Sequence, residues 1–451
     1  MKKNIINLLR FSLVAFLLVG FSGCTSKNKV NQSATGSNNA NVIFLWSVED
    51  EPFWADAATA FVQANKNYTF KYKQIAFDDR YEEKLLNALT SGEGPDVWAM
   101  PDDWVYRHKE KLFALPATQM KNFSFDNLVP SVKTKNVIGG NLYAVANYGQ
   151  PLYLYYNKTV VINKLSPIVD NPAENAEKRE KVRSLLSDRL PVTWDDATYL
   201  SNLITEKNGS QISLGGLALG TSKINYSQDI LYLLMLQKGA QMTSEDLKVA
   251  TFSLPKENAS GRGMPGKDAL DFYTSFANPS SSNYSWNDSL GDNIDAFCNN
   301  KSAMIVGYPQ TEKILTEKCP NIGVKKSLMP QFTETENSVD YAKNISYGIS
   351  WLSPKKEISW EFLKQLSGGR GVRTSNISPK VKDRVPDTGD LDLAAMNTSA
   401  GFLKGRFPAE FDGYIEKAID DVNSGLLDSQ SALSSAANEI NEKLLKNAEW
   451  R

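Results

Sequence analysis

The chain has 451 residues, a formal net charge of −1, 41% hydrophobic residues and 10% aromatic residues. This length exceeds what a single hydrophobic core normally serves, so two domains are expected. The weakly acidic balance excludes the basic surface that a nucleic-acid-binding protein needs.

The N-terminus has the pattern of a secretory signal peptide. Lys2, Lys3 and Arg10 supply a basic start, and an apolar run from 11 to 21 follows. Small residues then precede Cys24, as they precede a cleavage site. The apolar run is too short to span a bilayer, which needs about 20 residues.

Cys24 resembles the cysteine of the bacterial lipobox, although Phe21 stands where leucine is usual. An ordinary signal peptide with an incidental cysteine is the alternative. The lipobox interpretation predicts that residues 1–23 are removed. Acyl chains on Cys24 would then hold the protein at the extracytoplasmic face of the cell membrane, periplasmic or extracellular. The mature chain would carry a net charge of −4, because three basic residues leave with the signal.

Residues 24–41 are rich in Ser, Asn, Thr and Lys and contain almost no apolar side chains. Such a composition cannot bury a core. We therefore expect a flexible tether that lets the folded body stand off the membrane.

The first ordered segments alternate between strand and helix patterns. The apolar run Val42–Trp46 is typical of a strand buried on both faces of a parallel sheet. The segments that follow are a helix over 53–66, a strand over 68–72, a helix over 80–89 and a strand over 96–100. This order favours an open α/β sheet with right-handed crossovers.

The same alternation continues to the C-terminus. The expected elements are strands over 153–156 and 303–306, and helices over 174–187, 194–205, 228–238 and 358–366. Thr193 is the expected N-cap of the helix over 194–205, and Asp428 or Ser429 caps a last helix.

Motifs for catalysis are scarce. The only histidine, His108, lies among charged neighbours, which predicts a solvated surface side chain rather than a catalytic base. A GxGxxG pattern at 261–266 follows polar residues and contains Pro265, so we interpret it as a mobile loop rather than a dinucleotide site. The adjacent acids Asp102 and Asp103 could serve a glycosidase, but adjacent acids are also common in loops.

Cys298 and Cys319 are the only cysteines besides Cys24. They form either a disulfide, which an extracytoplasmic compartment permits, or two separate buried thiols; the bridge is slightly favoured. Their spacing fits no zinc site. We expect no metal and no cofactor.

Aromatic residues recur where predicted strands end. Trp46 ends the first strand, Trp104 follows the strand over 96–100, and Tyr308 follows the strand over 303–306. Ligands of open α/β sheets lie outside the carboxyl ends of the strands. Aromatic faces stack on sugar rings, and nearby carboxylates accept hydrogen bonds from sugar hydroxyls. The pattern favours a carbohydrate site, although core packing is the more frequent role of any single aromatic residue.

Several segments form a recognisable set when they are taken in order. The segments are 81–85 with the GPDV strand at 94–97, GGNLY at 139–143 with YYNK at 155–158, PVTWDD at 191–196, and AF at 296–297 with KSAMI at 301–305. Together they resemble the bacterial extracellular solute-binding proteins of the sugar type, which are receptors of ABC importers. Asp196 stands where the family has Glu, and Asn300 where it has Gly.

The resemblance implies a two-lobe, periplasmic-binding-protein-like (type II) fold, in which each lobe is an open α/β sheet and a cleft lies between the lobes. The lobes would be residues 42–148 plus 344–396 and residues 149–343 plus 397–451. The chain would cross between them near Tyr148–Pro151, Tyr341–Asn344 and Asn397, and these hinges would let the lobes close on a ligand.

The resemblance also implies ligand-binding positions near the strand ends and crossings. We assign Trp98 and Trp194 to the core and expect one of Tyr155 and Tyr156 there too. The predicted ligand-binding residues are Trp46, Glu49, Asp50, Asp102, Asp103, Trp104, Tyr148, Tyr153, Trp286, Tyr308, Trp351, Arg406 and Phe407.

The sequence therefore predicts a lipid-anchored, monomeric, non-enzymatic receptor that binds a mono- or oligosaccharide and delivers it to the transmembrane subunits of an ABC permease. One alternative is a glycan-cleaving enzyme, which would hold two acids of separated pKa in one pocket. Another is a sensory or adhesive sugar-binding lipoprotein without a permease.

Overall fold

The structure is a computed structural model that describes residues 41–116, 128–186, 191–258, 261–332, 337–366 and 399–448. The signal peptide, Cys24, nearly all of the tether and the third crossing near Asn397 lie outside the described residues. Within these ranges, no helix has both the length and the apolar content to cross a membrane.

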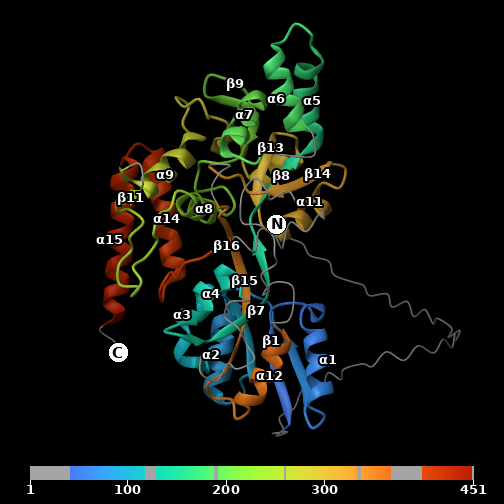
Figure 1. Cartoon of the computed structure of the whole chain (residues 1–451), viewed down its shortest axis with the longest axis vertical. Helices are drawn as coiled ribbons and strands as arrows, with labels where there is room; N and C mark the ends of the chain where they lie inside the picture. The colour runs from blue at the N-terminus through green and yellow to red at the C-terminus, as the bar shows by residue number, and fades with distance from the viewer. Residues whose placement is uncertain are drawn as a thin grey trace, which may run out of the picture. The chain divides into compact units, whose positions relative to one another are not determined.

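A mixed sheet, here called the first sheet, contains the predicted N-terminal strands (Figure 1). Its order is β16-β15-β3-β1-β2, and β7 also pairs with β15. The strands are β1 (Val42–Ser47), β2 (Thr69–Gln74), β3 (Val97–Pro101), β7 (Ala144–Pro151), β15 (Asp340–Ile349) and β16 (Ser399–Ala400). Both β2 and β3 pair in parallel with β1, which confirms the predicted parallel arrangement.

The helices of this part follow the strands. They are α1 (Ala55–Ala64), α2 (Tyr81–Ser91), α3 (Asp103–Arg107), α4 (Pro130–Asn136) and α12 (Lys356–Leu366), with short 3₁₀ turns at Glu51–Phe53 and Lys109–Lys111. A small antiparallel sheet adds β4 (Leu115–Pro116), β5 (Val137–Ile138) and β6 (Asn141–Leu142).

A second sheet has the order β14-β8-β13-β10-β9. Its strands are β8 (Tyr153–Asn157), β9 (Glu206–Asn208), β10 (Gln211–Leu217), β13 (Ser302–Gly307) and β14 (Val324–Leu328). The strands β10 and β13 are parallel, whereas β8 and β14 run antiparallel to their neighbours.

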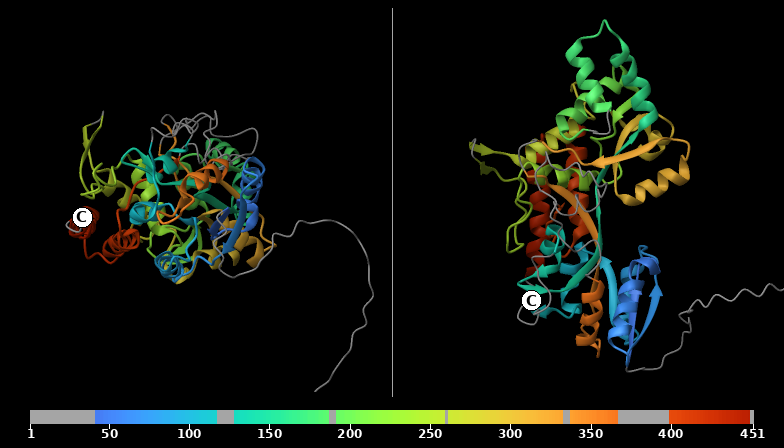
Figure 2. Two further views of the ribbon diagram at one scale, coloured as in Figure 1. Left: turned by 90° about the horizontal axis from the view of Figure 1, so that it is seen from below. Right: turned by 45° about the vertical axis from the view of Figure 1, so that its right-hand side comes forward.

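Helices accompany the second sheet, and α5 and α6 lie side by side in Figure 1 and in the right view of Figure 2. The helices are α5 (Lys158–Asp170), α6 (Ala176–Leu186), α7 (Trp194–Ile204), α8 (Ser227–Gln237), α9 (Pro265–Ser275), α10 (Asn293–Cys298), α11 (Pro309–Lys318), α14 (Pro408–Asn423) and α15 (Ser429–Ala448), with a 3₁₀ turn at Asp288–Leu290.

Buried apolar side chains separate into cores that follow the two sheets. The cores of the first sheet draw on residues 43–146 and 342–366. The core of the second sheet draws on residues 152–341 and 402–440. The change from one core to the other therefore falls in β7 and in β15.

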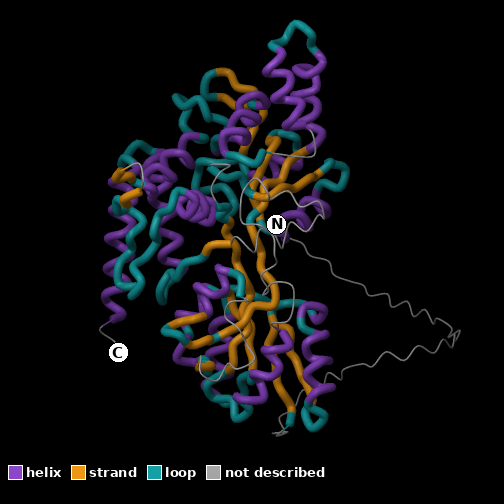
Figure 3. The backbone as a smooth tube through the Cα atoms, in the orientation of Figure 1, coloured by secondary structure: helices purple, strands orange, loops and turns teal. Residues whose placement is uncertain are grey.

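The strands β7 and β15 run antiparallel beside each other and carry the chain from one core to the other (Figures 1 and 3). Lys343 pairs with Gln150, and the register shifts between Asn344 and Ser346. Such an irregularity bends a strand pair and increases its twist. The joint between the two cores is thus an interrupted ladder rather than a regular one.

Local signals in the sequence place several helix ends correctly. Thr193 caps α7, because its side-chain oxygen accepts a hydrogen bond from Asp196 N at 3.2 Å. Asp428 accepts a hydrogen bond from Ser431 N at 3.0 Å at the start of α15. Each cap satisfies a backbone donor that the first helical turn leaves without a partner.

The prediction of a mobile loop at 261–266 is wrong. Strands β11 (Lys256–Asn258) and β12 (Gly261–Gly263) form an antiparallel hairpin, and Pro265 then begins α9. Proline suits this position because its fixed φ matches the first helical turn. A Cβ at Gly266 would lie 2.0 Å from Phe252 O, so this glycine serves close packing. The pattern does not follow a parallel strand and is no dinucleotide site.

Cys298, at the end of α10, and Cys319, just after α11, form a disulfide with their Cα atoms 5.4 Å apart. Both side chains are half-buried. Among the described residues, no group of three or more His, Cys, Asp or Glu side chains is placed to hold a metal ion.

The disulfide should stabilise the fold by restricting the unfolded chain. Because it closes a sequence separation of 21 residues, we expect Cys298→Ser to lower the free energy of unfolding by about 3 kcal/mol. Denaturant unfolding measures this loss. Cys319→Ser and the double variant should give the same value, and a reductant that leaves the wild-type midpoint unchanged would contradict the prediction.

Candidate functional site

The carboxyl ends of the parallel strands β1, β2 and β3 meet at one edge of the first sheet. The register pairs Ser47 with Gln74 and Trp46 with Trp98. This carboxyl edge is where open α/β sheets bind their ligands. The segments that leave it contain predicted ligand-binding residues, among them Glu49, Asp50, Asp102, Asp103 and Trp104.

An aromatic cluster, which we call the aromatic platform, lies at this edge. The ring of Phe77, after β2, lies 5.5 Å from that of Trp104 and 5.4 Å from that of Tyr81. Tyr81 is buried and donates a hydrogen bond to Ala99 O, which fixes the position of its ring beneath the other two. Trp104 is half-buried, and Phe77 is 49% exposed. The platform offers an open apolar face of the kind that stacks on sugar rings.

Sequence reasoning missed Phe77. It stands between β2 and α2, after Ile75 and Ala76 and outside any periodic segment, so its pattern predicts neither a strand nor a helix. The rule that found Trp104, an aromatic residue shortly after a parallel strand, would also have found Phe77 if it had been applied to β2.

Two acids follow β1 at the same edge, and they differ in exposure. Glu49 is buried, and its Oε2 accepts a hydrogen bond from the Tyr347 hydroxyl at 2.5 Å. Asp50 is exposed and accepts a hydrogen bond from Gln74 Nε2 at 2.7 Å. Asp50 is therefore open to solvent and to a ligand, whereas Glu49 positions Tyr347.

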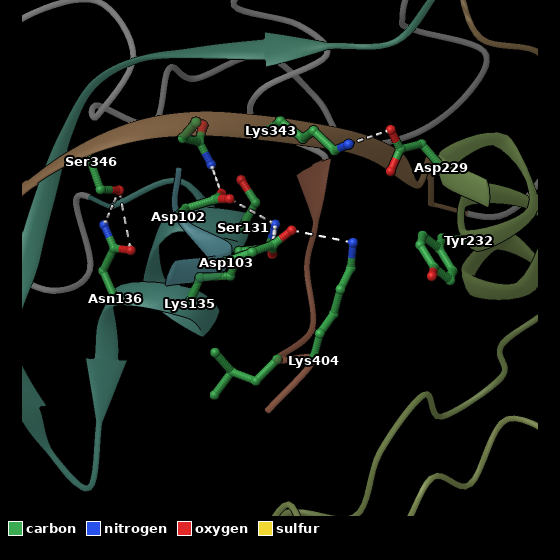
Figure 4. Close-up of polar contacts among 12 residues, drawn as sticks. Asp102, Asp103, Ser131, Lys135, Asn136, Asp229, Tyr232, Lys343, Ser346 and Lys404 are labelled. Atoms are coloured by element: carbon green, nitrogen blue, oxygen red, sulfur yellow. Dashed lines mark hydrogen bonds and ion pairs between the residues drawn. The ribbon is translucent and has the colours of Figure 1, made fainter. Parts of the chain in front are cut away.

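Asp102 and Asp103 lie in a buried polar network beside β15 (Figure 4). Lys135 Nζ, which is fully buried, lies 3.1 Å from Asp102 Oδ1 and 2.9 Å from Asp103 Oδ1. Asn344 Nδ2 donates a hydrogen bond to Asp102 Oδ2 at 2.6 Å. The network is built from α3, α4 and the irregular part of β15.

Lys404 joins this network to the second core. Its Nζ lies 3.2 Å from Asp103 Oδ2 and 2.7 Å from Asp412 Oδ1 on α14. Lys343 of β15 similarly lies 2.6 Å from Asp229 of α8. These ion pairs link residues of the first sheet to helices that pack on the second core.

The paired charges shift one another's protonation. Burial alone would lower the pKa of Lys404, but Asp103 and Asp412 outweigh burial and raise it. Burial alone would raise the pKa of Asp103, but Lys135 and Lys404 outweigh it and lower it. Burial raises the pKa of Asp102 despite the charge of Lys135. Lys135 and Lys404 therefore stay charged, and Asp103 is their main counter-ion.

Tyr308 lies close to this network. It is buried, its ring meets that of Tyr226 edge-on at 4.9 Å, and Lys343 Nζ lies 5.6 Å from the ring centroid. Burial and, next, the charge of Asp229 raise the pKa of the Tyr308 hydroxyl. It remains a neutral donor.

Arg406 and Phe407 lie against α3, next to the platform. Arg107 of α3 donates a hydrogen bond to Arg406 O at 3.0 Å, and its guanidinium lies 5.9 Å from the Phe407 ring. Arg406 also pairs with Glu110 at 2.5 Å. A pocket here is lined by Lys404, Phe407, Glu410, Phe411, Tyr414, Ile440 and Lys443.

Three predicted ligand-binding residues are core residues in the structure. Trp46 is 5% exposed because its ring packs in the first core, with Lys73 Nζ 4.9 Å from its centroid. Trp286 and Tyr153 are buried in the second core. Their apolar area stabilises the cores and offers no face to a ligand.

Trp351, another predicted ligand-binding residue, does not belong to these cores. Trp351 is exposed but follows Ile349, which pairs with Val97 at the amino end of β3. It therefore lies at the edge opposite the aromatic platform. Tyr148 belongs to β7, and its side chain lies outside the described residues.

His108 is not the solvated side chain that its neighbours in sequence predict. It is 2% exposed and packs between the rings of Trp98 and Trp104, with Nε2 3.0 Å from Glu82 Oε1. Burial lowers its pKa to about 4. Arg107, the residue before it in sequence, pairs with the same Glu82 carboxylate at 2.8 Å. Trp98 and Trp194 are core residues, as predicted, as is Tyr155, whereas Tyr156 is half-buried.

Comparisons with known proteins agree with this architecture. A family model described as bacterial extracellular solute-binding protein matches residues 46–368. No curated protein matches the chain significantly. Many solved structures share its fold.

Three of these structures illustrate the similarity. The cyclic α-maltosyl-1,6-maltose-binding protein of Arthrobacter globiformis is 15% identical, with a TM-score of 0.64 over 90% of this chain and 99% of that one. The sugar-binding protein MalE of Xanthomonas citri is 16% identical, with a TM-score of 0.63 over 90% and 98%. An ABC substrate-binding protein of Listeria monocytogenes in complex with cycloalternan is 14% identical, with a TM-score of 0.61 over 90% and 99%. The predicted fold class, α/β and periplasmic-binding-protein-like of type II, is confirmed.

The titration of His108 should make the fold sensitive to acid. The unfolded chain binds a proton near pH 6.5 and the folded chain near pH 4, so acidification between these values favours the unfolded state. We expect the free energy of unfolding to fall by up to about 3 kcal/mol across this range. Because His108 is the only histidine, its imidazole resonance reports the folded pKa without ambiguity.

His108→Gln is the control for this effect. Glu82, Arg107 and Lys111 also face the imidazole and remain in the variant. The acid-dependent loss between pH 6.5 and pH 4 should be smaller in the variant. An imidazole that titrates near pH 6.5 in the folded protein would contradict the assignment.

Lys404 should be essential to the fold of the joint. Lys404→Met leaves Asp412 without its lysine and Asp103 with Lys135 alone, and we expect it to cost about 3–5 kcal/mol of unfolding free energy. The matched control is Lys223→Met, which breaks the exposed pair with Asp288 and should cost far less. Chemical denaturation compares the two variants, and equal losses would show that the buried pairs have no special weight.

Proposed function

The chain belongs to the family of bacterial extracellular solute-binding proteins, and we propose on this premise that it binds a mono- or oligosaccharide. In this proposal the protein is a lipid-anchored receptor that delivers the sugar to the transmembrane subunits of an ABC permease. The sugar leaves chemically unchanged.

The observation that carries the proposal is the aromatic platform at the carboxyl edge of β1, β2 and β3. Phe77 and Trp104 offer an apolar face, and the Asp50 carboxylate follows the neighbouring strand. A sugar has C–H faces that stack on such rings and hydroxyls that donate hydrogen bonds to carboxylates. The combination of an open aromatic face and acceptor groups at one sheet edge fits this ligand class.

We propose that two lobes close over this platform. The proposed limits are 42–148 plus 344–396 and 149–343 plus 397–451. Support comes from the separate cores and from their change within β7 and β15. Arg406 and Phe407, which belong to the second part and contact α3, would then contact the sugar beside the platform.

The proposed ligand-binding set is therefore narrower than the sequence prediction. It retains exposed or half-buried side chains next to the platform and adds Phe77. The set is Asp50, Phe77, Trp104, Arg406 and Phe407, with Glu49 and Tyr308 as buried positioning residues. Asp102 and Asp103 have no direct contact with the ligand in this proposal. Their carboxylates already pair with Lys135 and Lys404, the buried lysines of the joint.

The ligands of similar proteins support an oligosaccharide. One of these proteins is described as a complex with cycloalternan, and a cyclo/maltodextrin-binding protein as a complex with maltotetraose. Lipid anchoring at Cys24, action as a monomer and delivery to a permease rest on the sequence. Genes for two permease subunits beside the gene of this protein would support delivery over a sensory or adhesive role.

The platform gives a direct test. We expect a panel of maltodextrins and cyclic oligosaccharides to raise the melting temperature of the wild type through binding to the folded state. Phe77→Ala and Trp104→Ala should each weaken the best ligand roughly tenfold, which corresponds to about 1.4 kcal/mol. Isothermal titration calorimetry measures the affinities.

Trp351→Ala is the matched control, because Trp351 is an exposed aromatic residue at the opposite edge of the same sheet. Its affinity for sugar should equal that of the wild type. Affinity that survives both platform variants would reject the site. Recovery of cleaved oligosaccharide after long incubation would instead favour the glycan-cleaving enzyme.

A further inference from the structure

We propose that the exposed side chains of Trp351 and Leu352, with Phe113 and Lys356, contact the lipid bilayer to which the chain is anchored. We call these four residues the Trp351 patch. The proposal rests on the proposed lipid anchor at Cys24. It assigns a second surface to the protein, at the edge of the first sheet opposite the sugar platform.

The Trp351 patch is an apolar surface with a cationic border. Trp351 is 53% exposed and Leu352 66% exposed, and they are consecutive in the turn after β15. The ring of Phe113 lies 6.2 Å from that of Trp351, and Lys356 Nζ lies 4.4 Å from the Trp351 centroid. No other tryptophan among the described residues is as exposed.

The backbone holds this patch in place. Trp351 N donates a hydrogen bond to Lys111 O at 2.9 Å, and Phe113 N donates one to Ile349 O at 2.8 Å. Two adjoining segments therefore present their apolar side chains together. An exposed apolar patch that the backbone holds in place is typical of an interaction site.

Asp96 ties the patch to the point where the folded body begins. Its carboxylate accepts hydrogen bonds from Phe44 N at 2.9 Å and from Ser353 Oγ at 2.6 Å, and it pairs with Lys355 at 2.8 Å. Lys355 Nζ in turn donates a hydrogen bond to Val42 O at 2.5 Å. The turn that carries Trp351 and Leu352 is thus bonded directly to the first residues of β1.

The length of chain between the proposed anchor and the folded body favours the bilayer as the partner of this patch. Residues 24–40 connect the proposed anchor to Asn41, and a chain of 17 residues spans at most about 60 Å. The start of β1, and with it the Trp351 patch, therefore stays within that distance of the bilayer. Tethering makes the contact intramolecular, so a weak attraction suffices to populate it.

The chemistry of the patch matches the interface of a membrane. Tryptophan concentrates at the boundary between headgroups and acyl chains, because its ring is apolar and its N–H needs a polar neighbour. A lysine beside it can keep its ammonium at the headgroups while its methylenes lie on apolar surface. Glu357 is exposed on the next position of α12, so we expect the lysine and the acid to limit how deeply the patch inserts.

The test uses the full-length lipidated protein in vesicles of phosphatidylethanolamine and phosphatidylglycerol, with and without brominated acyl chains. Bromine quenches only tryptophan that enters the bilayer. We expect quenching in the wild type, and its loss in Trp351→Phe and in Leu352→Ser. The matched control is Leu426→Ser, which removes a leucine of 68% exposure from the turn between α14 and α15 and should leave quenching unchanged.

Flotation of the same vesicles separates this proposal from the lipid anchor. Cys24→Ala should abolish flotation if the anchor exists. Flotation that needs Cys24 while wild-type quenching is absent would reject the patch and keep the anchor. Flotation that does not need Cys24 would reject the anchor. Quenching that persists in Trp351→Phe would assign the contact to other tryptophans, and a concentration-dependent dimer that Trp351→Ala dissociates would replace the bilayer with a second copy.

Discussion

Two lysines buried at the joint between the cores constrain the rest of the structure. An ammonium removed from water costs several kcal/mol unless a carboxylate compensates it, and losing one member of a buried pair is more costly still. Lys404 is compensated by Asp103 on one side and Asp412 on the other, which belong to parts of the chain with different cores. Both carboxylates must stay in place for the lysine to remain buried. The electrostatics of the joint therefore limit how far the two parts can separate.

The first sheet has two edges with different properties. The carboxyl edge of β1, β2 and β3 exposes the aromatic platform of Phe77 and Trp104. The amino edge holds the carboxylate of Asp96, which bonds the start of β1 to the turn that carries Trp351. Parallel strands produce this division, because all their carboxyl ends lie at one edge. A sugar at the platform and a bilayer at the Trp351 patch would consequently not compete for the same surface.

Local patterns in the sequence were sufficient for most helices and strands. Alternating apolar residues predicted β2, and Thr193 predicted the start of α7, because strand periodicity and capping depend only on near neighbours. The same local view failed for His108 and for the glycines at 261–266. His108 is buried despite its charged neighbours in sequence, because the rings of Trp98 and Trp104 pack against its imidazole. The glycines belong to a hairpin and a helix start rather than to a loop.

By itself, the sequence determined the α/β class, the parallel order of the first strands and the position of Asp50 and Trp104 after strand ends, because these follow from residue spacing along the chain. The two-lobe, type II fold was implied by the resemblance of its motifs to a known family. Only the tertiary structure decided which candidates are accessible. Trp46 and Trp286 pack in cores, Asp103 is neutralised by lysines, and Trp351 lies at the opposite edge through the register of β15. The accessibility of a side chain depends on which residues, distant in sequence, pack against it. Residue spacing along the chain does not specify those contacts.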